Sequence, residues 1–172
     1  TLDTSSAYGN SEEVLGGALN QLGLEFKIVS KYLMSLGSVE EVFVSSIEKL
    51  KIEKLYGYLI HHFEDYIEQP QIWNEMLCLK QVGKIEKIGF SLYTPDQLQY
   101  LLDHEVAFDI LQFPYNMFDR QFEPYMQALC DRGVEIHTRS AFMQGLFFKD
   151  VETLPAKLHP LYPYLQSLHD FS

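Results

Sequence analysis

Residues 26–31 read Phe-Lys-Ile-Val-Ser-Lys, a short β-rich run that ends in a lysine. Five other runs along the chain have the same form, a few residues typical of a strand followed by a polar side chain. We expect strands at 2–4, 26–30, 56–60, 85–90, 108–113 and 134–138. The polar side chains near their carboxyl ends are Asp3, Lys31, His61, Ser91, Gln112, Arg139 and Ser140.

Stretches of helical period separate these runs. Successive strands begin roughly 23 to 30 residues apart, which leaves room for one β/α unit per interval and predicts a parallel sheet. The first helix follows Asn10, with Glu13 three residues later as in an N-terminal capping pattern. The apolar stripes at helical spacing are Val14, Leu15, Ala18, Leu19 and Leu22; Val39, Val42, Phe43, Ile47 and Leu50; Ile72, Trp73, Met76 and Leu77; and Phe122, Tyr125, Met126 and Leu129. The glycines expected at helix ends, where positive φ is needed, are Gly23, Gly57, Gly83 and Gly133.

Parallel β/α units either close into an eight-stranded barrel or open into a doubly wound sheet. Barrel enzymes draw functional groups from several strand ends, whereas an open nucleotide-binding sheet concentrates its signal in one glycine-rich turn. This chain has polar groups at several strand ends and contains neither GxGxxG nor GxxxxGK[ST]. We therefore expect an α/β fold, a parallel (β/α)8 TIM barrel, as one domain over residues 1–172. Residues 154–172 hold three prolines and are expected to form a loop that leads into a helix.

The composition disfavours several classes of partner. A net charge of −11 argues against nucleic acid, because that contact needs clustered lysine and arginine. No apolar run approaches the ~20 residues that span a bilayer, and no signal peptide is expected. Cys78 and Cys130 are too few for a disulfide framework and fall in amphipathic stretches, so we expect buried, reduced thiols and a cytoplasmic protein. No metal site is expected, and the sequence makes no prediction of oligomeric state.

A cluster of reactive groups is expected where the strands end. Lys31 would be desolvated there, and Asp3 can be its partner, which by itself would be a structural ion pair at the barrel mouth. Tyr8 follows Asp3 by five residues in a Tyr-Gly turn, so its hydroxyl can lean back over the strand ends. An ammonium nearby favours the phenolate and makes the phenol a usable acid. His61 could hydrogen-bond the phenol or a substrate oxygen, or it could be a core residue while His62 faces inward.

Several segments together resemble the aldo-keto reductase family. Residues 2–12, Leu-Asp-Thr-Ser-Ser-Ala-Tyr-Gly-Asn-Ser-Glu, are similar to the family's second strand and loop, where an Asp and a Tyr five residues apart precede a Gly and a Ser-Glu helix start. Lys31 in Ile-Val-Ser-Lys and His61 in Tyr-Leu-Ile-His resemble the family's lysine and histidine. Residues 83–91, Gly-Lys-Ile-Glu-Lys-Ile-Gly-Phe-Ser, and residues 111–116, Leu-Gln-Phe-Pro-Tyr-Asn, resemble two later strands. The likeness runs from residue 2 to about residue 150.

The resemblance implies an NAD(P)H-dependent oxidoreductase that reduces an aldehyde or a ketone to an alcohol. It implies Tyr8 as the general acid, assisted by Lys31, Asp3 and His61. The residues implied for cofactor binding are Ser91, Gln112, Arg139, Ser140, Phe142 and Gly145. NADPH is expected rather than NADH. The expected partner is a small carbonyl compound, and Arg139 with the two histidines suggests a polar, sugar-like one.

Two positions depart from the family pattern. Leu92 stands where the family usually has Asn, which removes one contact to the nicotinamide amide. Residues 139–145, Arg-Ser-Ala-Phe-Met-Gln-Gly, stand where many members have Tyr-Ser-Pro-Leu before a Gly, so the aromatic that stacks on nicotinamide is absent from its usual place. Arg139 could stack through its guanidinium, meet a substrate anion, or pair with a carboxylate.

The resemblance also implies that the barrel is incomplete. A barrel typically takes ~250 residues, and these 172 match the family's second to seventh strands, so the first and eighth are expected to be absent. Either segments are omitted or the chain is a fragment. The family's last strand and the helix after it carry the basic residues for the cofactor's adenosine phosphate, so these 172 residues do not themselves distinguish NADP from NAD.

Two other functions stay open. A barrel aldolase would use Lys31 as a Schiff-base nucleophile, and a non-catalytic relative would bind cofactor as a scaffold or sensor. Asp3 and Tyr8 argue against both. A scaffold requires neither residue, and a lysine clamped by an aspartate stays protonated, which disfavours nucleophilic attack.

Overall fold

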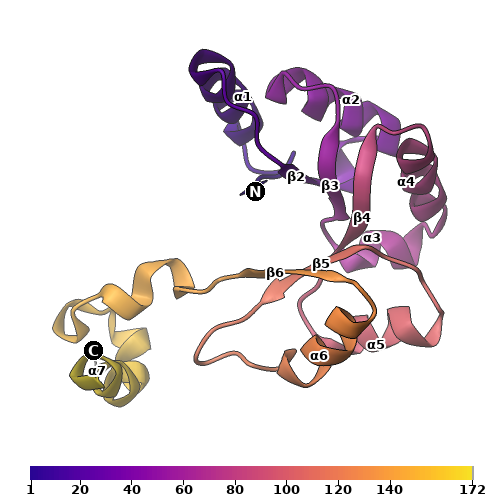
Figure 1. Ribbon diagram of the computed structural model, residues 1–172. Helices are drawn as coiled ribbons and strands as arrows, with labels where there is room; N and C mark the ends of the chain where they lie inside the picture. The colour runs from indigo at the N-terminus through magenta and orange to yellow at the C-terminus, as the bar shows by residue number, and fades with distance from the viewer. Residues whose placement is uncertain (172) are drawn as a thin grey trace.

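The computed structural model describes residues 1–171. Six strands form one parallel sheet, and their order in space is their order in the sequence (Figure 1). The strands are β1 (Leu2–Asp3), β2 (Ile28–Tyr32), β3 (Leu55–Ile60), β4 (Ile85–Ser91), β5 (Ile110–Pro114) and β6 (Glu135–Arg139). Each overlaps an expected strand, so the parallel β/α alternation is confirmed.

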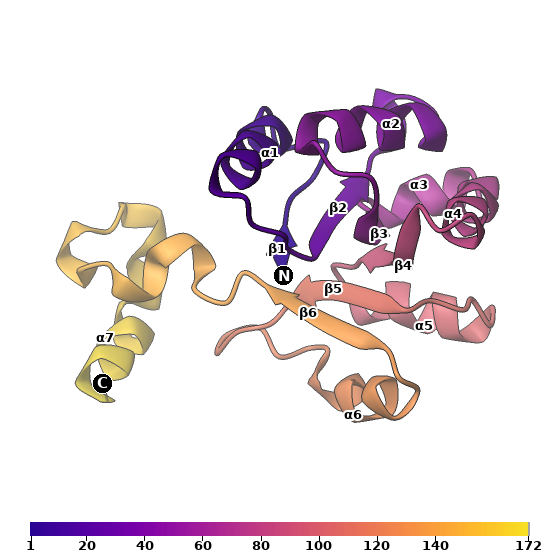
Figure 2. The ribbon, with the colours of Figure 1, turned by 45° about the horizontal axis from the view of Figure 1, so that its top comes forward.

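The helices that lie between the strands in the sequence cover the convex face of this curved sheet, as Figure 2 shows. The helices are α1 (Ser11–Leu22), α2 (Val39–Leu50), α3 (Phe63–Glu68), α4 (Gln71–Gln81), α5 (Pro95–Asp103), α6 (Glu123–Asp131) and α7 (Tyr162–Phe171), with 3₁₀ turns η1 (Met34–Leu36), η2 (Met143–Phe148), η3 (Val151–Thr153) and η4 (Ala156–Leu161). The strands curl around a common concave side as in part of a (β/α)8 barrel, and β1 and β6 are its two edges. The barrel class is therefore confirmed, with six strands present.

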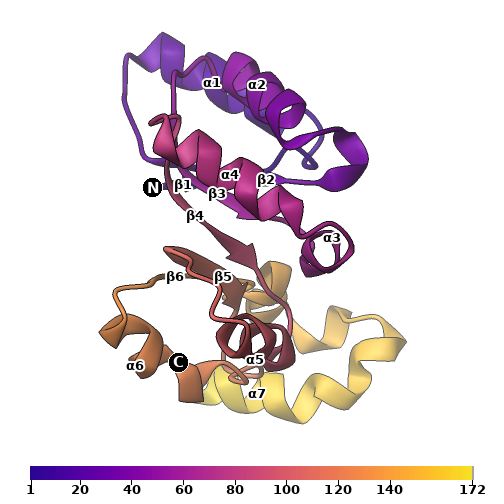
Figure 3. The ribbon, with the colours of Figure 1, turned by 90° about the vertical axis from the view of Figure 1, so that its right-hand side faces the viewer.

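The main apolar core lies between the sheet and the helices. Every residue of β3 is buried, as expected of a central strand in a parallel sheet. Trp73 of α4 stacks on Phe90 of β4, with ring centroids 4.6 Å apart. Helices α1 and α2 lie side by side, and α2 packs against β2 (Figure 3). This packing fixes the strands whose ends carry the candidate site.

Three local expectations in the first half of the chain are wrong. Val14 and Leu22 of α1 are exposed, whereas Glu12 is buried and accepts a hydrogen bond from Ser30 Oγ at 2.6 Å. Helix α1 lies beside the edge strand β1, so its outer side has little to pack against among residues 1–171. Asn10 makes no side-chain cap hydrogen bond. Gly57 lies inside β3, and the residue that ends α2 in the left-handed region is Lys51.

Two other expectations concern the cysteines and the tail. The expectation that Cys78 and Cys130 are buried is wrong: both are free cysteines that lie exposed on the outer side of their helices and not on the buried stripe. After β6 the chain leaves the sheet through η2, η3 and η4 and ends in α7, so the loop leading into a helix is confirmed, with Ser172 outside the described residues. Figure 1 shows this segment beside the sheet and away from α1 to α4. Within residues 1–171, no helix combines the length and apolar character that a membrane span requires.

Gly89 controls how closely β5 approaches β4. A Cβ added at Gly89 would lie 1.7 Å from the carbonyl oxygen of Ile110, its register partner on β5. We expect Gly89→Ala to destabilise the fold by about 1–3 kcal/mol, as in other overpacked cores, because backbone cannot move aside as a flexible side chain can. Urea unfolding would measure this loss.

Gly17→Ala is the matched control. A Cβ at Gly17 of α1 meets no atom within 4 Å. This variant should be neutral or more stable by up to about 1 kcal/mol, since alanine has the higher helix propensity. Equal unfolding midpoints for the two variants would contradict the close approach of β4 and β5.

Candidate active site

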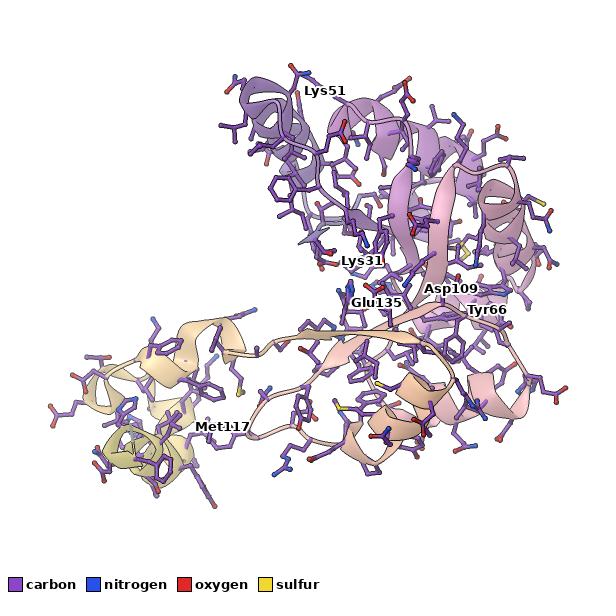
Figure 4. The ribbon with its side chains drawn as sticks, in the orientation of Figure 1. Lys31, Lys51, Tyr66, Asp109, Met117 and Glu135 are labelled. Atoms are coloured by element: carbon purple, nitrogen blue, oxygen red, sulfur yellow. The ribbon has the colours of Figure 1, made fainter. Side chains whose placement is uncertain are left out.

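The site is built around a buried lysine. Lys31 extends from β2 into the concave side of the sheet, and its side chain is only 1% exposed (Figure 4). Its Nζ donates to Asp3 Oδ2 at 2.7 Å and to the Thr4 carbonyl oxygen at 2.8 Å. Burial lowers the pKa of Lys31 below its ordinary value, and the Asp3 carboxylate opposes that shift. The expected Asp3–Lys31 pair is therefore present, and Thr4 supplies an acceptor that the sequence did not reveal.

Tyr8 lies over this pair. Its backbone N–H donates to the Ser5 carbonyl oxygen at 3.0 Å, which closes the turn after β1. Lys31 Nζ is 5.1 Å from the centre of the Tyr8 ring. The ring also meets that of His61 edge to face, with centroids 5.7 Å apart. Tyr8 is 47% exposed, and its hydroxyl has no hydrogen-bond partner among residues 1–171, so a ligand can reach it.

The pKa of Tyr8 corrects one expectation. Partial burial raises the pKa, the charges of Asp3 and Tyr93 raise it further, and Arg139 lowers it. The expectation that Lys31 lowers this pKa is wrong. The Lys31 ammonium donates to Asp3 and Thr4 and faces the Tyr8 ring. The cation whose charge lowers the pKa of Tyr8 is Arg139.

His61 is the inward-facing histidine of the pair. It is 8% exposed, whereas His62 is exposed. Its Nδ1 lies 3.0 Å from Ser5 Oγ, so its hydrogen bond goes to Ser5 and not to the Tyr8 phenol. Burial first, and then the charges of His62, Lys31 and Arg139, lower the pKa of His61 to about 4. The imidazole is therefore neutral at physiological pH.

Ser91 ends β4, and Gln112 in the middle of β5 is its register partner; both are buried. Gln112 Nε2 donates to Asp3 Oδ1 at 2.8 Å, which joins β5 to β1 across the concave side. Gln112 Oε1 is buried with no hydrogen-bond partner within residues 1–171. A buried amide oxygen in this state is costly, so the site presents an unused acceptor to a ligand that carries N–H groups.

Arg139 stacks on an aromatic ring of its own chain. Its guanidinium carbon lies 4.0 Å from the centre of the Tyr93 ring, and Nη2 donates to the Leu92 carbonyl oxygen at 3.1 Å. Its Nε is buried without a partner, and no carboxylate of residues 1–171 forms an ion pair with it. Of the three alternatives for Arg139, the pairing with a carboxylate is therefore excluded in this part of the chain.

The other three residues expected at the cofactor lie beyond β6. Ser140 is exposed, with φ 59°, and its carbonyl oxygen accepts from Asn116 Nδ2 at 3.2 Å. Phe142 is 59% exposed and packs against Phe148, with centroids 5.3 Å apart. Gly145 has φ 84° in the turn that follows. Within the described range, no hydrogen bond or ring contact joins these three to Ser91, Gln112 or Tyr8.

Two neighbours of the cluster were missed by the sequence analysis. Ser5 contacts His61, and Tyr93 supports Arg139. Tyr93 comes two residues after Ser91, so the rule that singled out polar strand ends could have extended to it. Ser5 gave no signal of its own, since its partner is 56 residues away. No group of three or more histidine, cysteine or acidic residues in residues 1–171 is arranged to hold a metal ion.

The sequence model of the aldo/keto reductase family matches residues 1–161. The chain belongs to the aldo-keto reductase family. The resemblance found in the strand-end motifs is thereby confirmed, because the match spans β1 to β6 and the 3₁₀ turns η2 to η4 after them.

Relatives of this aldo-keto reductase include aldo-keto reductase YhdN of Bacillus subtilis, 27% identical over 139 residues, which are 71% of this chain and 41% of YhdN. An NAD/NADP-dependent indole-3-acetaldehyde reductase of Schizosaccharomyces pombe is 29% identical over 108 residues, 59% of this chain and 38% of the relative. The chain thus spans about two fifths of the length of these relatives. The structure of a Gox0644 variant in complex with NADPH has the same fold, with a TM-score of 0.70 and 21% identity, over 86% of this chain and 55% of that one.

Proposed function

We propose that this chain supplies the chemical centre of an enzyme that reduces an aldehyde or a ketone to an alcohol with a nicotinamide cofactor. The observation that carries the proposal is the grouping of Tyr8, Lys31, Asp3 and His61 at one mouth of the barrel. An accessible phenol beside a buried ammonium and a neutral imidazole can donate a proton to an oxygen atom. Such groups stabilise the negative charge that develops on a carbonyl oxygen during reduction, by donating hydrogen bonds and a proton.

The residues present fit a nicotinamide. Gln112 Oε1 is a buried acceptor without a partner, and a carboxamide N–H can supply the missing hydrogen bond. Ser91 is its register neighbour and offers a hydroxyl to the same group. When bound, the nicotinamide supplies the hydride. Leu92 is apolar where the family usually has Asn, so Ser91 and Gln112 are left to hold the carboxamide.

In the proposed reaction the carbonyl carbon gains the hydride and the carbonyl oxygen gains a proton. Tyr8 donates that proton from its hydroxyl as its O–H bond breaks, and the resulting phenolate regains a proton from solvent, to which Tyr8 is exposed. His61 donates a hydrogen bond to the same oxygen. Lys31 stays in its ion pair with the Asp3 carboxylate beneath the Tyr8 ring. Lys31 is therefore a positioning and electrostatic group with no bond to substrate.

Three finer assignments complete the proposal. NADPH is the expected cofactor, supported by the NADPH complex of the Gox0644 variant, although the Schizosaccharomyces pombe relative is named as using both nucleotides. The substrate is a small polar carbonyl compound, because Arg139 has no carboxylate partner in residues 1–171 and lies close enough to influence the pKa of Tyr8. A cytoplasmic setting is supported by the two free thiols.

Transfer of a label tests the proposal. The full-length protein, given glyceraldehyde and other small aldehydes with NADPH deuterated at the reactive position of the ring, should form an alcohol with deuterium on its carbinol carbon. As a control, unlabelled NADPH in D₂O should leave that carbon free of deuterium, because solvent supplies only the oxygen-bound proton. Turnover of the aldehydes without deuterium on carbon would reject hydride transfer.

A further inference from the structure

Ser5 links Tyr8 and His61, the two residues that contact the carbonyl oxygen in the proposed function. It is fully buried in the turn between β1 and Tyr8. Its carbonyl oxygen accepts from the Tyr8 N–H at 3.0 Å, and its Oγ accepts from the Ala7 N–H at 3.1 Å. The same Oγ lies 3.0 Å from His61 Nδ1. One side chain thus holds the Tyr8 turn and the His61 ring together.

Counting protons and lone pairs decides which atom donates in the Ser5–His61 hydrogen bond. A serine hydroxyl has one proton to donate and two lone pairs, and the Ala7 N–H occupies one lone pair. If His61 carried its proton on Nδ1, Ser5 would accept twice, and its own proton would have no acceptor among residues 1–171. Such a buried, unpaired hydroxyl proton is unfavourable. If Ser5 donates to Nδ1, every group is satisfied and the imidazole proton resides on Nε2.

We propose that Ser5 is a positioning residue that holds His61 as the Nε2–H tautomer, so that this N–H points into the site as a hydrogen-bond donor for the carbonyl oxygen. The contact between His61 and substrate rests on the function proposed above. The tautomer itself does not, because it follows from the contacts of Ser5 alone.

The surroundings of His61 keep this arrangement in place. The imidazole is neutral, so one nitrogen must lack a proton and the choice of tautomer matters. Nε2 has no hydrogen-bond partner within residues 1–171, which leaves it free for a ligand. The Tyr8 ring, which meets the imidazole edge to face, limits rotation of the imidazole. With the proton on Nε2, the imidazole offers a donor to the carbonyl oxygen that Tyr8 protonates in the proposed reaction, whereas the other tautomer would present a lone pair that repels this oxygen.

Nitrogen-15 NMR of the full-length protein labelled on histidine gives the first test and needs no variant. At neutral pH, Nδ1 of His61 should resonate downfield as an unprotonated nitrogen, and Nε2 should resonate upfield as a protonated one. Assignment would use His61→Gln, which removes one pair of signals. A predominantly protonated Nδ1 in the unaltered protein overturns the proposal.

Ser5→Ala gives the second test. Without the hydroxyl, the His61 signals should move toward a mixture of tautomers, and turnover of glyceraldehyde with NADPH should fall about two- to tenfold, the range for loss of one neutral hydrogen bond. The KM for NADPH should be unchanged. Ser5→Thr keeps a hydroxyl and should restore both the tautomer and the turnover. Ser46→Ala removes another buried hydroxyl, one without a partner in residues 1–171, and should change neither readout.

The two readouts separate the possible failures. A purely structural role for Ser5 would lower turnover through the Tyr8 turn while His61 stays the Nε2–H tautomer, and that result overturns the proposal. If the unaltered protein reduces no aldehyde, the proposed function fails, but the NMR comparison of Ser5→Ala with Ser46→Ala still decides whether Ser5 sets the tautomer.

Discussion

Lys31→Met should lower the turnover of carbonyl reduction by at least about tenfold, and by no more than the ~10²- to 10⁴-fold that a general acid contributes. Methionine fills a similar volume but cannot donate to Asp3 Oδ2 or to the Thr4 carbonyl oxygen. The Asp3 carboxylate would then act without a counter-charge, and it already raises the pKa of Tyr8. A phenol with a higher pKa releases its proton less readily, so the loss should appear in turnover.

The effect of Lys31→Met should depend on Tyr8. If the two residues act as one unit, a double variant of Lys31→Met and Tyr8→Phe should be little slower than Tyr8→Phe alone. Lys27→Met is the matched control, because Lys27 lies just before β2, is exposed, and contacts the Tyr56 ring away from the mouth. Steady-state kinetics on one aldehyde would compare all four proteins with the parent.

Borohydride trapping separates this account from Schiff-base chemistry at Lys31. Burial lowers the pKa of Lys31, which is the direction that a nucleophilic lysine needs, but Asp3 and Thr4 both bind the ammonium form. We therefore expect no substrate-sized mass increase on the peptide that holds Lys31. Such an adduct, or a fully additive double variant, would contradict the assigned role.

The sequence predicted the fold well because β/α alternation is a local property. Each strand is a short apolar run, and each helix has its own period, so the six parallel strands could be placed to within about two residues. The errors occurred where distant packing overrides the local pattern. Val14 continues an apolar stripe yet is exposed at the sheet edge, and Gly57 resembles a helix terminator but sits in β3, with its missing Cβ facing Val29 at 3.0 Å.

The site was predictable only in part for the same reason. The rule that parallel strands end at one edge is enough to predict that Asp3, Lys31 and His61 lie together. Which atoms touch depends on contacts far apart in sequence: Gln112 with Asp3, Ser5 with His61, and Arg139 with Tyr93. The spacing of apolar and polar residues along the chain does not predict such long-range contacts. The direction of the Tyr8 pKa shift was missed because it depends first on how far the folded chain buries the ring, and then on the nearby charges of Asp3 and Tyr93.

Tyr8→Phe should have the largest effect of any single substitution in the site. The change deletes one hydroxyl and keeps the ring, and that hydroxyl makes no hydrogen bond within residues 1–171, so neither the edge contact with His61 nor the fold should suffer. Cofactor affinity should also be unchanged, because Ser91 and Gln112 are untouched. Without the hydroxyl, the oxygen that gains charge as hydride arrives has no proton donor.

Whether Tyr8 is the proton donor is decided by the turnover of Tyr8→Phe with NADPH and a small aldehyde, measured together with NADPH titration and thermal unfolding of the same samples. Tyr100→Phe serves as control, since Tyr100 is also partly exposed but stacks on His104 away from the mouth. We expect a ~10²- to 10⁴-fold loss of turnover for Tyr8→Phe, with unchanged NADPH affinity and unfolding midpoint, and parent-like turnover for Tyr100→Phe. Retention of more than about a tenth of the parent turnover by Tyr8→Phe, below the range for general acid catalysis, would contradict the assignment of Tyr8 as the proton donor.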